Sequence, residues 1–248
     1  MNSQRPYFIG IAGGTASGKT TLCKEIIKQL NMVGDFTLLT MDNFYKDLTA
    51  EQMEDVANYN FDAPDSLDFD EMHETVQQLL QYKDVEIPDY DFSTNSRKKD
   101  KITVKASHFI LFEGILALYD ERLRDLMDFK IFVYEDADTR LLKRIKRDTS
   151  ERGRTVVGVL HQWHKTVKPS YDEFVHLTLK TADIIVNGNS GNWRAVNFVV
   201  SNLKTILNNY INAPNENGSK AVKHSEKGDS LTEMEPQRSQ KSSDNPAE

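Results

Sequence analysis

Near its start the chain carries an octapeptide of the form G-x-x-x-x-G-K-S/T, which is Gly13-Gly14-Thr15-Ala16-Ser17-Gly18-Lys19-Thr20. An apolar run at 7–11 precedes this octapeptide, and a helical spacing of apolar residues over 19–30 follows it. Glycines let successive backbone N–H groups converge on phosphate oxygens at a helix N-terminus, so this context predicts a nucleoside triphosphate site. The alternative interpretation, a chance glycine-rich turn, would require neither the strand nor the helix.

Two side chains of the motif carry specific chemistry. Lys19 adds positive charge at the β- and γ-phosphates, and the Thr20 hydroxyl is placed to ligate Mg²⁺. The motif alone does not separate a GTPase switch from a transferase, but the run at 134–138 holds no guanine-reading N-K-x-D. The predicted ATP-binding residues of the loop are Gly13, Gly14, Thr15, Ala16, Ser17, Gly18, Lys19, Thr20 and Thr21.

The order of apolar runs predicts the fold class. Strands are expected at 7–11, 36–40, 109–112, 129–133 and 183–186, and helices at 19–30, 71–80, 137–151, 156–166 and 193–210. Continuous apolar strands that alternate with helices predict an α/β P-loop NTPase fold, with a doubly wound parallel five-stranded sheet and helices on both faces. The weakly alternating segment 87–104 predicts a small antiparallel β-hairpin excursion beside that sheet.

Composition limits the class of protein. The 248 residues carry a net charge of −7, which disfavours extended nucleic-acid binding. No apolar run reaches the roughly 20 residues of a membrane span, and the start lacks a signal-peptide pattern. Cys23 is the only cysteine, which indicates a reducing, cytoplasmic location. We expect one domain at 1–212 and a disordered polar tail at 213–248.

Two carboxylates follow predicted strands. Asp42 comes after the strand at 36–40, and Glu113 ends the strand at 109–112. The carboxyl ends of strands face the ligand crevice in doubly wound sheets, so Asp42 is a candidate base for an acceptor hydroxyl and Glu113 a candidate Mg²⁺ neighbour. The alternatives are a helix cap or turn residue for Asp42 and an ordinary strand-ending residue for Glu113.

A basic run over 140–154 stands out in this acidic chain. We interpret Arg140 and Lys146 as parts of a solvated helix face. The remaining arginines predict a helical lid at about 144–168 that closes on the triphosphate and neutralises charge during transfer. These lid residues are Arg144, Arg147, Arg152 and Arg154.

Six segments together resemble the uridine kinase (uridine–cytidine kinase) family of P-loop nucleoside kinases, over about residues 7–210. They are the segments 9–20, 42–45, 59–65, 87–92, 112–115 and 147–154. The resemblance implies Mg²⁺-dependent transfer of the ATP γ-phosphate to the 5′-hydroxyl of uridine or cytidine, in pyrimidine salvage. It also implies a homotetramer and feedback inhibition by CTP and UTP.

The resemblance assigns roles to individual residues. Asp42 corresponds to the general base on the 5′-hydroxyl, and Asp62 to a carboxylate that accepts hydrogen bonds from both ribose hydroxyls. The implied catalytic residues are Asp42, Lys19 and Arg147, and the implied Mg²⁺ neighbourhood is Thr20, Glu113 and Asp42. Phosphate-facing residues are Arg144, Arg152 and Arg154. Further substrate-facing residues are Tyr45, Phe61, Tyr90, Phe92, Asn95, Arg147 and Gln162.

The residues alone leave alternatives open. Tyr90 and Phe92 share a strand face and so also fit a core stripe, and Asp62 precedes Pro64 as a turn residue does. Asn95 stands where the family has His; its amide both donates and accepts, which leaves the preference between uridine and cytidine open. Rival functions are a P-loop kinase of another small alcohol, such as pantothenate or phosphoribulose, and a catalytically silent nucleotide-binding regulator.

Overall fold

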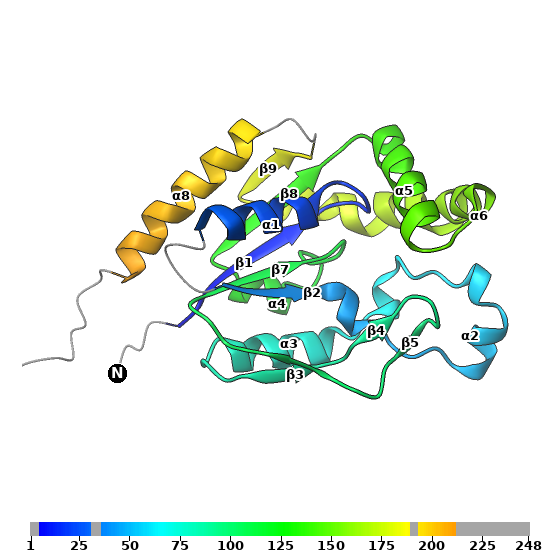
Figure 1. Cartoon of the computed structure of the whole chain (residues 1–248), viewed down its shortest axis with the longest axis horizontal. Helices are drawn as coiled ribbons and strands as arrows, with labels where there is room; N and C mark the ends of the chain where they lie inside the picture. The colour runs from blue at the N-terminus through cyan, green and yellow to red at the C-terminus, as the bar shows by residue number, and fades with distance from the viewer. Residues whose placement is uncertain (1–4, 31–35, 189–192, 212–248) are drawn as a thin grey trace, which may run out of the picture. The chain divides into compact units, whose positions relative to one another are not determined.

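A computed structural model describes residues 5–30, 36–188 and 193–211. Within this part, five parallel strands form one sheet in the order β2-β7-β1-β8-β9, which confirms the predicted fold class (Figure 1). The tail predicted at 213–248 lies outside the described residues. The strands are β1 (Tyr7–Ala12), β2 (Phe36–Thr40), β7 (Phe109–Glu113), β8 (Phe129–Tyr134) and β9 (Ile184–Asn187).

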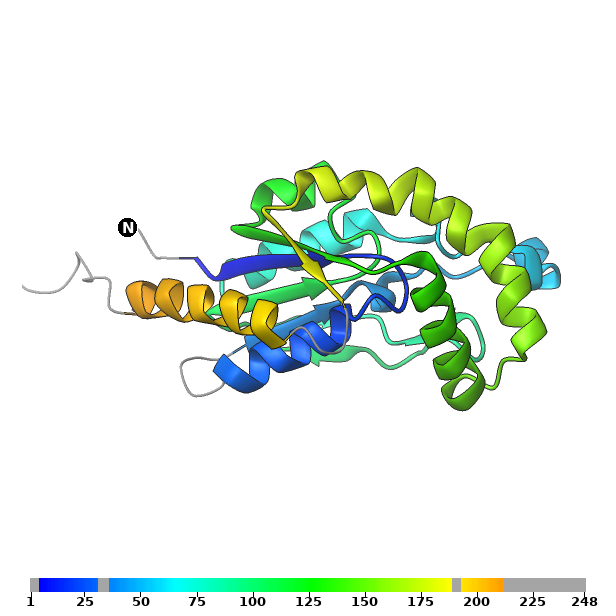
Figure 2. The same ribbon diagram turned by 90° about the horizontal axis from the view of Figure 1, so that it is seen from above.

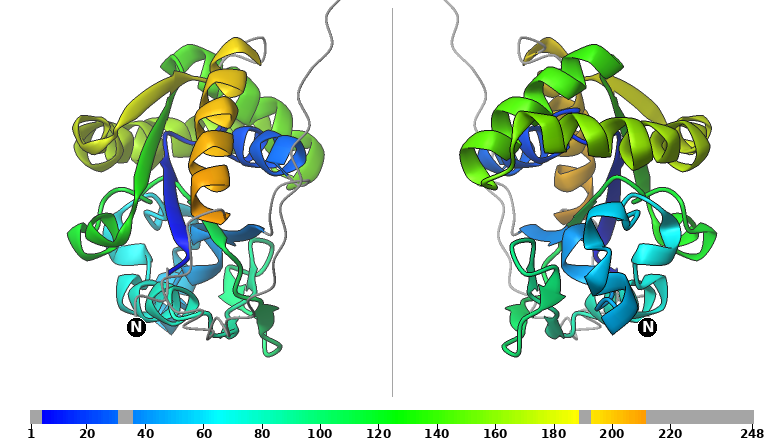
Figure 3. Two further views of the ribbon diagram at one scale, coloured as in Figure 1. Left: turned by 90° about the vertical axis from the view of Figure 1, so that its left-hand side faces the viewer. Right: turned by 90° about the vertical axis from the view of Figure 1, so that its right-hand side faces the viewer.

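Helices cover both faces of this sheet. Alternate strand residues such as Ile9 and Ile11 pack against α1 (Lys19–Leu30) and α8 (Trp193–Ile211), which lie side by side on one face (Figure 2). Phe8 and Phe112 point to the other face, where α3 (Phe69–Leu79) and α4 (Glu121–Leu126) complete a second core. The two end-on views in Figure 3 show the sheet between these helix layers. This alternation is the two-residue period of a strand.

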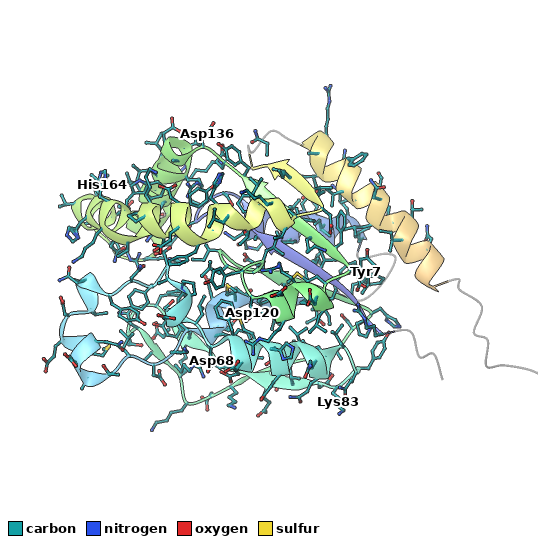
Figure 4. The ribbon with its side chains drawn as sticks, turned by 180° about the vertical axis from the view of Figure 1, so that it is seen from behind. Tyr7, Asp68, Lys83, Asp120, Asp136 and His164 are labelled. Carbon is teal, nitrogen blue, oxygen red and sulfur yellow. The ribbon has the colours of Figure 1, made fainter. Side chains whose placement is uncertain are left out.

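The remaining helical elements lie mainly at the end of the sheet to which β1 points (Figures 1 and 2). Figure 4 labels Asp136, just before α5, and His164, after α6, far from Tyr7 at the start of β1. No helix among the described residues is long and apolar enough to cross a bilayer. These elements are α2 (Ala50–Glu54), α5 (Ala137–Glu151), α6 (Val156–Gln162), α7 (Lys168–Ser170) and the 3-10 turns Met41–Phe44, Val56–Asn58 and Pro64–Ser66.

The excursion predicted at 87–104 is antiparallel, as expected, but it consists of two short strand pairs. The outer pair joins β3 (Val85–Ile87) to β6 (Ile102–Val104), and the inner pair joins β4 (Tyr90–Asp91) to β5 (Ser96–Arg97). Asn95 in the inner turn has a φ of 52°, a left-handed conformation that asparagine tolerates better than most residues. The turn directs this segment towards the carboxyl end of the main sheet.

The helix predicted at 156–166 is the beginning of a longer helical run. After α6 the chain continues through a π turn (Trp163–Val167), α7, a second π turn (Tyr171–Val175) and a 3-10 turn (His176–Thr181). Pro169 lies inside the run, between the π turns. A π turn shifts the hydrogen-bond register, which allows a helical path around a residue that lacks an N–H.

Arg140 corrects one prediction, because it is not part of a solvated face. Its side chain is only 1% exposed and lies over the rings of Tyr171 at 3.9 Å and Trp163 at 5.3 Å. Its Nε donates to the carbonyl of Glu135 at 3.1 Å, and a Cβ on Gly14 would meet its Nη1 at 2.5 Å. The guanidinium therefore supports the phosphate loop from beneath. Lys146 on the same helix is exposed, as predicted.

We expect Arg140→Ala to lower the free energy of unfolding by roughly 2–4 kcal/mol, because it removes a buried side chain and its cation–π contacts. Urea denaturation measures the change. Lys146→Ala is the matched control and should shift stability by no more than about 0.5 kcal/mol. Equal effects of the two substitutions would contradict the supporting role of Arg140.

Candidate active site

A cavity of about 720 Å³ lies where the loops that follow β1, β2 and β7 meet α5 and α6. Its walls bring together most residues that the sequence singled out: Thr15, Ala16, Gly18, Lys19, Thr20, Thr21, Asp42, Tyr45, Phe61, Asp62, Phe92, Asn95, Glu113, Arg144, Arg147, Arg152, Arg154 and Gln162. Predicted residues that do not line the cavity are Gly13, Gly14, Ser17 and Tyr90.

The loop at 13–18 has the backbone of an anion-binding turn. Gly13 and Gly18 have φ values of 148° and 101°, which disfavour any residue with a Cβ. A Cβ on Gly13 would also meet the carbonyl oxygen of Val133 at 2.3 Å. Lys19, which lines the cavity, donates from its Nζ to the carbonyl of Gly14 at 3.1 Å. The close approach of Gly13 holds the loop against β8, and the Lys19 bond ties the loop to the start of α1.

Two strand-end carboxylates face this loop. Glu113 is buried at the end of β7 and accepts a hydrogen bond from the Thr20 hydroxyl at 2.7 Å. Asp42 is half-buried in the 3-10 turn that follows β2. The register pairs Thr40 with Glu113, so both acids leave neighbouring strands at one level. These carboxylate and hydroxyl oxygens beside the loop at 13–18 are of the type that Mg²⁺ prefers as ligands.

Burial and mutual charge tune these groups. Burial, and next the charge of Glu113, raise the pKa of Asp42, although Lys19 opposes the shift. Burial lowers the pKa of Lys19, against the attraction of Glu113 and Asp42. Burial also raises the pKa of Asp62, which Arg144 opposes. Perturbed acids and bases gathered in one cavity are typical of catalytic sites.

Aromatic residues form a wall of the cavity. The Tyr45 ring lies 6.0 Å from Phe61 and 5.9 Å from Phe92, both in edge-on contact. Tyr90 is a buried supporting residue behind this wall, 5.1 Å from Tyr45 and 5.3 Å from Phe92. Flat aromatic faces beside the half-buried carboxylate of Asp62 suit a planar, hydroxylated ligand.

The lid arginines and Gln162 belong to one network. The Gln162 amide oxygen accepts from Arg154 at 3.1 Å and from Arg144 at 3.5 Å. Arg144 also donates to Thr15 in the phosphate loop at 3.1 Å, and the Arg152 guanidinium lies 4.7 Å from the centre of the Phe92 ring. The network connects the phosphate loop to the aromatic wall. Gly153, between Arg152 and Arg154, has a φ of 62°, a left-handed conformation that favours glycine.

Sequence reasoning missed three residues at this site. A Cβ on Gly188 would meet the carbonyl oxygen of Ser17 at 1.8 Å, so this glycine lets β9 approach the phosphate loop. Lys143 lines the cavity and pairs with Glu135 at 2.5 Å. Asp148 is fully buried among the lid arginines. The available signal for Gly188 was a glycine just after a strand, and that for Asp148 was an acid within a basic run.

Comparison with known proteins assigns the family. Residues 8–192 match the model of the phosphoribulokinase / uridine kinase family. The chain is 43% identical to uridine-cytidine kinase B of Dictyostelium discoideum over 206 residues, which cover 83% of this chain and 84% of that protein. It is 46% identical to uridine-cytidine kinase-like 1 of Mus musculus, but there the match covers 83% of this chain and 38% of the relative. The chain thus spans well under half the length of some relatives.

The fold has solved counterparts. Phosphoribulokinase from Rhodobacter spheroides superposes with a TM-score of 0.56 at 16% sequence identity. The superposition covers 75% of this chain and 71% of that one. At this identity the likeness concerns the arrangement of strands and helices.

The raised pKa of Asp42 generates a prediction on stability. This pKa is raised in the folded protein, so stability falls as the pH rises from the ordinary aspartate pKa of 3.8 to the raised value, and the full penalty remains above it. The penalty disappears when both the folded and the unfolded state are protonated. Asp42→Asn should therefore raise the melting temperature at pH 7 by roughly 2–4 °C, the effect of about 1 kcal/mol at this chain length. The gain should vanish below about pH 4, near the ordinary aspartate pKa of 3.8.

Melting curves between pH 3.5 and 8 measure this difference. Asp70→Asn, at a largely exposed position on α3, is the control and should change little at any pH. A lower melting temperature for Asp42→Asn at pH 7 would contradict the charge penalty.

Proposed function

Because the chain belongs to the phosphoribulokinase / uridine kinase family, we propose that it transfers the γ-phosphate of ATP to the 5′-hydroxyl of uridine or cytidine. The observation that carries this proposal is the shared cavity, in which the phosphate loop, Asp42 and the aromatic wall with Asp62 meet. The names of the relatives support the same activity. The product would be UMP or CMP, as in pyrimidine salvage.

The mechanism is in-line transfer. Asp42 orients the 5′-hydroxyl and accepts its proton, and its raised pKa makes it a stronger base than an exposed aspartate. Lys19 and the phosphate-loop N–H groups bind the donor phosphates. Arg147 and the other lid arginines stabilise the charge that develops on the transferred group.

The residues present fit Mg²⁺. Glu113 and Asp42 place negative charge in the cavity, and Thr20 adds a hydroxyl. Among the described residues no cluster of three or more His, Cys, Asp or Glu side chains forms a closed metal cage. This agrees with Mg²⁺, which keeps waters and substrate phosphates as ligands. When bound, the ion would neutralise charge on the phosphates.

The acceptor side favours a nucleoside over another small alcohol. A base would lie against Tyr45, Phe61 and Phe92, while Asp62 would accept hydrogen bonds from the ribose hydroxyls. Tyr90 would hold this wall in place from behind. Asn95 and Gln162 also line the cavity, and Asn95 has the donor and acceptor needed to read a base edge.

Four further properties remain proposals by family resemblance: a homotetramer, feedback inhibition by CTP and UTP, the use of Mg²⁺ and a cytoplasmic location. The buried, unpaired Cys23 is compatible with the last of these.

A panel assay tests the proposed function. Purified protein with ATP and Mg²⁺ should form UMP from uridine or CMP from cytidine, with no product from pantothenate or ribulose 5-phosphate. Because Asp62 would lose one ribose partner, 2′-deoxyuridine should be phosphorylated with a kcat/KM lower by about 10²-fold or more.

The outcomes of this panel separate the rivals. Product only from another alcohol would favour the phosphoribulokinase-like reading, and no product from any acceptor would favour a nucleotide-binding regulator. Phosphorylation of thymidine as readily as uridine would remove the role of Asp62.

The role of Asp42 has its own test. Asp42→Asn should lower kcat by about 10²–10⁴-fold, the usual contribution of a general base, while ATP affinity changes only a few-fold. Steady-state kinetics and ATP titration measure the two effects, with Asp70→Asn as control. A kcat near that of the parent protein would exclude Asp42 as the base.

A further inference from the structure

One carboxylate lies at the centre of the lid arginines. Asp148, in the last turn of α5, is fully buried, with 0% of its side chain exposed. Both of its oxygens face guanidinium groups, and these four contacts are Arg147 at 2.8 Å, Arg154 at 3.0 Å, Arg144 at 3.5 Å and Arg152 at 3.9 Å. We call Asp148 and these arginines the arginine cluster.

The main chain of Asp148 adds to this arrangement. Its carbonyl oxygen accepts hydrogen bonds from the backbone N–H groups of Arg154 at 3.0 Å and Arg152 at 3.3 Å. The same residue thus fixes the turn that carries two of the arginines and holds their side chains. Although burial opposes ionisation, Arg147 and Arg144 keep the pKa of Asp148 below its ordinary value.

The charges in the cluster do not balance. Guanidinium groups stay protonated at any ordinary pH, so four positive charges surround one negative charge. All four arginines line the cavity, and Arg144 reaches the phosphate loop through Thr15. Without the Asp148 carboxylate the arginines would repel one another more strongly and would be held less precisely at the cavity. With it, the cluster keeps an excess of positive charge directed at the donor site.

We infer that Asp148 is a positioning residue, a built-in counter-ion that keeps the four arginines together at the cavity until the donor phosphates supply the rest of the negative charge. The inference rests on the proposed function only in naming the donor triphosphate as the anion. Asp148 does not line the cavity, whereas all four arginines do, so it acts through the arginines. It therefore affects how precisely they meet the transferred phosphate.

This role separates binding from catalysis. Asp148→Asn removes a negative charge beside the phosphate site, so inorganic tripolyphosphate should bind about 3–10-fold more tightly at low salt, with a steeper salt dependence. The arginines would be less well placed, so kcat should fall by about 10–100-fold. A purely structural role predicts the opposite for the anion, because a damaged site would lose affinity and kcat together.

The experiment compares Asp148→Asn with Asp138→Asn, the same change at an exposed position on the first turn of α5. Calorimetry with tripolyphosphate at several salt concentrations and steady-state kinetics are the measurements. The control should match the parent protein in both. Weaker tripolyphosphate binding by Asp148→Asn, or a kcat within about 3-fold of the parent, would overturn the inference.

If Asp148→Asn folds poorly, a second variant still tests the inference. The double variant Asp148→Asn/Arg152→Gln removes one repelling charge, so its melting temperature should exceed that of the single variant by several degrees. A lower value would overturn the inference. If the parent protein phosphorylates no nucleoside, the proposed function fails, whereas tripolyphosphate binding and these melting temperatures still test Asp148.

Discussion

The parallel register of β1, β2 and β7 is the constraint on which the site depends. Ile11 and Thr40 both pair with Glu113, so the segments that follow these strands leave the sheet at one level. The phosphate loop and Asp42 consequently meet the Glu113 carboxylate through short connections. A shift of β7 by one residue would turn Glu113 to the opposite face and break its hydrogen bond with Thr20. The apolar cores on both faces resist such a shift, because it would move each buried side chain of the strand into the core on the opposite face, where the packing does not fit it.

The site gathers charges that the fold alone would not favour. Burial raises the pKa of Asp42 and of Asp62 and lowers the pKa of Lys19, so each group is disfavoured in its ionised form. Opposite charges nearby offset part of that cost. The Asp148 carboxylate likewise offsets part of the mutual repulsion of the lid arginines. A bound polyphosphate would neutralise the remaining positive charge of the arginines, and a divalent cation the negative charge of the strand-end carboxylates. These uncompensated charges lower the stability of the protein in exchange for function.

The sequence predicted the five strands of the parallel sheet, most of its long helices and the glycine-rich loop, because apolar runs and a local glycine motif carry these features. It predicted neither the order of the strands in the sheet nor the short helices α2 and α4. It could not predict the burial of Arg140, since the rings that cover it come from Trp163 and Tyr171, far along the chain. An acid within a basic helix, such as Asp148, has the pattern of a solvated ion pair until tertiary packing removes the water. The helical run past Pro169 was missed for a local reason, because proline normally ends a helix.

Side-chain contacts connect the phosphate-facing part of the cavity to the aromatic wall. Arg152 contacts Asp148 on the phosphate-facing side, and its guanidinium lies against the Phe92 ring on the other side. Phe92 in turn packs on Tyr45, next to the turn that holds Asp42. A ligand that moves the Phe92 ring therefore changes the surroundings of Arg152, and an anion that moves Arg152 changes those of Phe92. Any resulting dependence between the affinities of donor and acceptor must be reciprocal.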